Sequence, residues 1–138
     1  MFMSAKEIQA THEPHPGDRD VSWDDNGDRH PEPESEFWNR KLDEARTPDR
    51  VSNHHLGTTL YDDVSKYGVL TPVALEDPAQ VSSKPVGWDP DVHKPRVMGG
   101  HHRIAVMAAT RPNDLMAVVH VGSVSEAHAS ERKSGGYN

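Results

Sequence analysis

The chain has 138 residues, a formal net charge of −7 and no cysteine. The absence of cysteine excludes disulfides, thiolate zinc sites and cysteine nucleophiles. The chain is acidic and lacks the clustered lysine and arginine side chains that a free-standing nucleic-acid-binding protein needs. With no signal peptide and no apolar run long enough to span a bilayer, we expect a cytoplasmic protein without a membrane partner.

The first 34 residues are predicted to be a disordered or loosely draped acidic arm, largely irregular in structure. Residues 1–50 hold 13 of the 22 acidic side chains but only seven of the 15 basic ones. Within this part, residues 11–34 combine proline, glycine, aspartate and histidine with hardly any aliphatic side chains. Such a segment buries too little apolar surface to offset the entropy of ordering, and Trp23 is its candidate anchor.

Residues 35–47 are predicted to form a short docking helix. Ser35 is a suitable N-cap, and the proline at position 48 ends the helical pattern. Phe37 and Trp38 lie near helical spacing with later apolar residues, so we expect them to dock this helix on the main domain.

Residues 51–125 are predicted to form one α+β domain, a small mixed sheet flanked by helices. Hydrophobic periodicity and the positions of glycine and proline place its elements. The expected order is a helix (57–67), a strand (69–76), a proline-rich loop (77–95), a strand (96–98), a helix (101–111) and a strand (115–122). The end of the chain, 126–138, is expected to be a frayed tail.

The stretch "VMGGHHRIAVMAA" at 97–109 is the candidate functional motif. Gly99 and Gly100 allow positive φ and a close approach of the backbone to a ligand. The helix that follows offers first-turn amides and the positive end of its dipole, which together favour an anion. Arg103 can bind two phosphate oxygens, and His101 and His102 can donate hydrogen bonds. The motif therefore predicts phosphate binding.

Two other interpretations of this motif compete with phosphate binding. The two glycines can simply form a tight strand-to-helix turn that leaves Arg103 on the surface. The histidine pairs at 54–55 and 101–102 can also suggest a metal site. Neighbouring helical side chains point about 100° apart, however, and zinc-binding helices use i and i+4 spacing, so we predict no metal site built from these histidines.

The pair of segments "LYDDVSKYGVLTPVAL" and "VMGGHHRIAVMAATRPNDLMAVVHV" resembles the ParB/sulfiredoxin superfamily, in the stand-alone ParB-like form ("ParB-like nuclease") encoded by phages of actinobacteria. The likeness covers about residues 56–121. The matching residues are Leu60, Val64, Gly68, Pro72 and Val73 in the first segment, and Gly99, Gly100, His102, Arg103 and Ile104 in the second.

This resemblance implies a ParB/sulfiredoxin-like fold that binds CTP or ATP, with Mg²⁺, at the turn from Gly99 to Arg103. It also implies a phosphate contact from Thr71. His101 stands where sulfiredoxin has its reactive cysteine and ParB has a glutamate, which leaves His101 as the candidate catalytic acid–base group. The family's helix-turn-helix would follow residue 121, where little sequence remains, so we expect DNA binding by this domain to be weak.

Two functions follow from these observations. The first is a ParB-like domain that binds nucleotide or nucleic-acid phosphate at Gly99–Arg103, with phosphoryl-transfer or nuclease activity as its expected chemistry if it is an enzyme. The alternative is a non-catalytic phage-type interaction protein, which binds a host or phage protein through the acidic arm or through a vestigial pocket.

Overall fold

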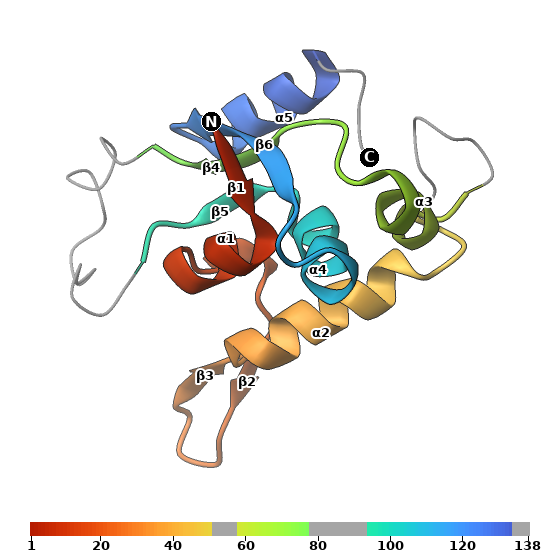
Figure 1. Ribbon diagram of the computed structural model, residues 1–138. Helices are drawn as coiled ribbons and strands as arrows, with labels where there is room; N and C mark the ends of the chain where they lie inside the picture. Colours follow the sequence, from red (N-terminus) through yellow and green to blue (C-terminus); the bar gives the residue numbers. More distant parts are fainter. Residues whose placement is uncertain (51–57, 78–93, 134–138) are drawn as a thin grey trace.

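The computed structural model describes residues 1–50, 58–77 and 94–133, and these contain a four-stranded sheet (Figure 1). The strands lie in the order β1 (Phe2–Ser4), β6 (Leu115–Val121), β4 (Val73–Glu76) and β5 (Val97–Gly99). The β6–β4 pair is parallel, and both outer pairs are antiparallel. The expected α+β class with a small mixed sheet is therefore confirmed.

Helix α4 (His101–Thr110) is the centre of the larger core. Three helices contact it, namely α1 (Ala5–Thr11), α2 (Glu34–Ala45) and α3 (Leu60–Tyr67). Its residues 103–107 are buried without interruption, as expected for a helix that is covered on more than one face. Figure 1 shows these helices on one side of the sheet and α5 (Val124–Lys133) on the other.

Helix α3 and the strand after it form where the sequence predicts them. The side chain of Thr59 caps α3 by accepting a hydrogen bond from the Asp62 amide at 3.1 Å. Gly68 ends the helix with φ of 77°, a conformation that glycine adopts without steric cost. The chain then enters β4, in which all four side chains are buried.

The N-terminal segment is ordered, which corrects the expectation of a largely irregular arm over 1–34. Strand β1 pairs with β6, and Ser4 caps α1 by accepting from the Glu7 amide at 3.1 Å. Ile8 is fully buried in the core cluster that surrounds α4. Further along, β2 (Val21–Trp23) and β3 (Arg29–Pro31) form a hairpin whose residues are all exposed (Figure 1). Tertiary pairing supplies the stability that local composition lacks.

The expected tail over 126–138 also needs correction, because α5 continues to Lys133. Ser123 accepts a hydrogen bond from the Glu126 amide at 3.2 Å, and the Glu126 carboxylate accepts from the Gly122 amide at 2.7 Å. This reciprocal cap fixes the start of the helix. Ala127 is fully buried against the outer face of the sheet. Most of the predicted loop over 77–95 and the histidine pair at 54–55 lie outside the described residues.

Candidate functional site

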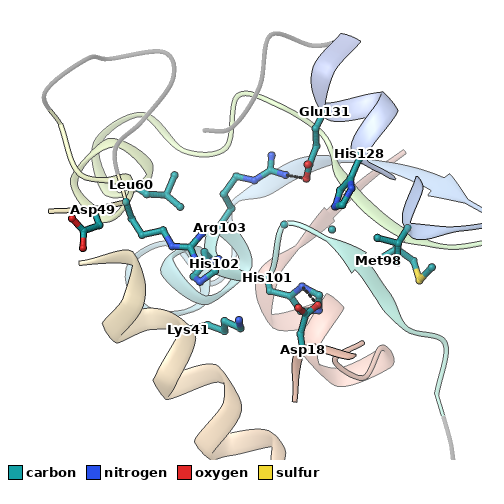
Figure 2. A pocket seen from close by; sticks show the side chains of 14 residues that line it. Asp18, Lys41, Asp49, Leu60, Met98, His101, His102, Arg103, His128 and Glu131 are labelled. Carbon is teal, nitrogen blue, oxygen red and sulfur yellow. Dashed lines mark hydrogen bonds and ion pairs between the residues drawn. The ribbon is translucent and has the colours of Figure 1, made fainter. Parts of the chain in front are cut away.

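A cavity of about 490 Å³ opens at the N-terminus of α4, and all five residues from Gly99 to Arg103 line it. Figure 2 shows the side chains that converge there from the N-terminal segment, α2, α4 and α5. Besides the motif, the lining residues are Asp18, Lys41, Asp49, Arg50, Leu60, Met98, Val124, His128 and Glu131. Residues distant in sequence therefore complete the predicted site.

Arg103 is buried, with 1% of its surface exposed, so the interpretation that places it on the surface is wrong. Its Nη1 donates a hydrogen bond to the carbonyl of Thr71, which precedes β4. Its Nη2 donates to the Glu131 carboxylate of α5 at 3.2 Å (Figure 2). The guanidinium of Arg103 on α4 thus connects α5 with the segment that precedes β4.

The two glycines make room for this ion pair. Gly100 has φ of 95°, and a Cβ added to it would lie 2.7 Å from the Val73 side chain and 3.0 Å from Arg103 Nη2. A Cβ added to Gly99 would lie 3.1 Å from the Glu131 carboxylate. A Cβ at Gly100 would therefore clash with Val73, and a Cβ at either glycine would crowd the charged pair and force it to shift.

His101 is almost completely enclosed, with 6% of its surface exposed. Its Nε2 accepts a hydrogen bond from the His15 amide at 3.2 Å, and its Nδ1 lies 3.6 Å from the Asp18 carboxylate. The ring packs edge-on against Phe37, with 5.4 Å between the centroids. Burial lowers the pKa of His101 to about 4, which outweighs the opposing effect of Asp18. His101 is therefore a neutral packing residue near pH 7.

Two cationic side chains, Lys41 and Arg50, also line the cavity near His102. His102 Nε2 lies 3.0 Å from the Glu44 carboxylate of α2. Burial lowers the pKa of His102, Glu44 opposes this shift, and the positive charges of Arg50 and Lys41 add to it. These two charges are thus close to the first turn of α4. Lys41 and Arg50 carry no sequence signal for this site, because both precede the predicted domain over 51–125.

Five of the six predicted phosphate ligands line the cavity, and the sixth, Thr71, does not. The structure brings Gly99, Gly100, His101, His102 and Arg103 to the cavity, but Thr71 is not among the lining residues. Thr71 instead supports Arg103 from behind through its carbonyl. Asp18 pairs with His101, and Glu131 pairs with Arg103. Neither acidic residue was predicted from the sequence to belong to the site.

Neither a metal cluster nor a membrane span emerges from the described part of the chain. Within residues 1–50, 58–77 and 94–133, no three His, Asp or Glu side chains are grouped so that they could hold a metal ion. Over the same ranges, every helix is too short or too polar to cross a bilayer.

Comparison with protein-family models, with curated proteins and with solved structures finds no match for this chain.

Proposed function

We propose that the chain is a ParB-like domain that binds the phosphate groups of a nucleotide or nucleic acid at the N-terminus of α4. The observation that carries this proposal is the cavity into which the first turn of this ten-residue helix and the side chains of Arg103, Lys41 and Arg50 converge. First-turn amides have no acceptor inside their own helix, and the helix dipole favours negative charge at this end.

The size and surroundings of the cavity suit a nucleotide. A volume of about 490 Å³ lies within the range of small-molecule sites. Arg103 is held in place by the Thr71 carbonyl, so little side-chain entropy is lost when its guanidinium meets a phosphate. Leu60 and Met98 supply apolar surface for the rest of the ligand.

Mg²⁺ fits this site as a companion of the ligand rather than as a resident ion. Asp18 and Asp49 are carboxylates that line the cavity, and Mg²⁺ is commonly held by one or two carboxylates together with substrate phosphates. Mg²⁺ would neutralise phosphate charge there. The resemblance to the ParB/sulfiredoxin superfamily supplies the proposed ligand, CTP or ATP with Mg²⁺.

The proposal is limited to binding. A general base must reach the proton that it abstracts, and the Nε2 of His101 already accepts a hydrogen bond from the chain's own backbone. The ring also packs against Phe37 rather than projecting freely into the cavity. These contacts do not support the catalytic role expected for His101.

A second candidate function, capture of a host or phage protein, is favoured by the β2–β3 hairpin. Trp23 is 66% exposed, and Val21, two residues earlier, lies on the same face. Residues 18–32 carry six acidic side chains and two arginines. An exposed tryptophan within an acidic hairpin suits a basic partner surface.

Calorimetric titration with CTP, ATP, GTP and single-stranded DNA, each with and without Mg²⁺, tests the first function. Wild type is compared with the double variant Arg103→Gln/Glu131→Gln, which removes the buried pair without leaving an uncompensated charge. We expect nucleotide affinity to fall more than tenfold in the double variant and several-fold in Arg50→Gln at the rim. Arg46→Gln, an exposed arginine outside the cavity, is the matched control and should bind like wild type.

Absence of any response to nucleotide or DNA in all of these proteins would contradict the proposed function. Pull-down of a partner that is lost in Trp23→Ser, together with that absence, would favour the protein-binding function instead.

A further inference from the structure

An anion already lies where the proposed phosphate would bind. The Oε1 atom of Glu131 is 3.2 Å from Arg103 Nη2 and 3.1 Å from the position that a Gly99 Cβ would take. Both side chains are buried, with 1% of Arg103 and 4% of Glu131 exposed. Figure 2 shows Glu131 reaching Arg103 from α5, across the top of the cavity. The space that the glycines create is therefore filled by the chain's own carboxylate.

This internal contact leaves the charges of the cavity balanced. Its lining contains three cationic side chains, Lys41, Arg50 and Arg103, and three acidic ones, Asp18, Asp49 and Glu131. Of the acidic groups, Glu131 is the one paired with the guanidinium at the first turn of α4. Removal of Glu131 from this position would give the cavity a net positive charge, as phosphate binding requires.

Helix α5 is attached to the sheet by a small apolar surface. Ala127 is fully buried, and Val124 is half-buried against the cluster on the outer face of the sheet. In the last described turns, His128, Ala129 and Arg132 are exposed while Glu131 is buried. Because few apolar contacts hold this half of the helix, its opening costs little compared with global unfolding.

We propose that Glu131 is an internal occupant of the phosphate position, and that a ligand phosphate binds by displacing it and releasing the C-terminal half of α5. This inference rests on the proposed function. A tethered carboxylate acts at high effective concentration, so a ligand with a single carboxylate competes poorly. A polyphosphate carries more charge and more acceptor oxygens, and it can use Arg103 together with the helix amides. The site thereby selects polyphosphates over simple carboxylates.

The test uses inorganic pyrophosphate and ATP, each with Mg²⁺, on the full chain. We expect Glu131→Gln to bind both ligands about tenfold more tightly than wild type, a change of about 1.4 kcal/mol. Glu36→Gln removes the same charge from an exposed position on α2 and should bind like wild type, which controls for net charge. Hydrogen exchange of wild type should become faster at the amides of residues 128–133 when ATP is added, because ligand binding releases this half of α5.

The outcomes separate the two proposals. Equal or weaker binding by Glu131→Gln, with clear binding by wild type, overturns the displacement of Glu131 and leaves the phosphate site standing. No binding by any of these proteins overturns the phosphate site itself. If Glu131→Gln does not fold, hydrogen exchange of wild type decides the matter, since a ligand that binds without faster exchange in α5 contradicts the displacement.

Discussion

The enclosed ring of His101 predicts that the protein loses stability as the pH falls below neutrality. The neutral ring accepts a hydrogen bond from the His15 amide and is surrounded by the titratable groups Asp18, Lys41 and His102. The variant His101→Gln places an amide oxygen near the position of Nε2, so it preserves the acceptor but cannot be protonated. Comparison of the two proteins therefore isolates the titration of this one group.

The size of the effect follows from the pKa difference. Burial lowers the pKa of His101 from 6.5 to about 4, so between these values the unfolded chain binds a proton that the folded chain does not. The free energy of unfolding must then fall as the pH falls. From pH 7 to pH 5, we expect wild type to lose about 2 kcal/mol more than His101→Gln. Above pH 7, the two profiles should run parallel.

Urea unfolding at pH 7, 6 and 5 measures this difference. Burial also lowers the pKa of His12 and of His102, but both residues are present in both proteins and their contributions cancel in the comparison. Parallel stability profiles from pH 7 to pH 5 would refute the placement of His101 in an enclosed, neutral site.

Further substitutions test other parts of the fold, each by urea unfolding or hydrogen exchange. Gly100→Ala should lower the free energy of unfolding by more than about 2 kcal/mol, because φ is positive there and the new Cβ would meet the Val73 side chain of β4. Gly27→Ala, with φ of 80° and open space around it, should lower this free energy by about 1 kcal/mol. Equal losses in the two variants would contradict the close packing of the turn at Gly100. Ile8→Ala should lower the free energy of unfolding by about 2–5 kcal/mol, whereas the control Lys6→Ala, at an exposed position, should lower it by less than about 0.5 kcal/mol. A small loss in Ile8→Ala, similar to that in Lys6→Ala, would mean that the N-terminal segment is not part of the core. Ser123→Ala should speed hydrogen exchange across 124–133 by about fivefold, since loss of a helix cap costs about 1 kcal/mol; unchanged exchange would mean that this cap does not hold α5.

The sequence predicted the elements whose signals are local. The helix predicted over 57–67 is observed as α3 and ends at Gly68 as expected, but it begins only at Leu60, after the Thr59 cap. The apolar stretch over 115–122 predicted the strand observed as β6, and the spacing of Ile104, Met107 and Ala108 predicted α4.

Helices α1 and α5 escaped prediction although both begin with the same signal. A serine is followed three residues later by a glutamate at Ser4–Glu7 and again at Ser123–Glu126, and in both places the serine oxygen accepts from the amide of the glutamate. The polar composition around these pairs concealed them. Their helices are stabilised by contacts with distant elements, such as the pairing of β1 with β6, which composition does not reveal.

The sequence predicted only part of the candidate site. The residues of its turn are neighbours in the sequence, whereas the charged side chains around the turn come from distant parts of the chain. The glycines and Arg103 lie within five residues and form a recognisable pattern. The partner of Arg103, Glu131, is 28 residues further along the chain. Lys41 reaches the cavity from a helix that sequence reasoning expected only to dock on the main domain. No spacing rule connects these residues, so the internal ion pair could be found only in three dimensions.

An NMR titration of the ¹⁵N-labelled chain with Mg²⁺ and pyrophosphate tests whether phosphate binds at the first turn of α4. We expect saturable shifts of the amides of Gly100, His101, His102 and Arg103, together with shifts in α5. Shifts confined to the hairpin at 21–31, or no saturable shift at all, would contradict it.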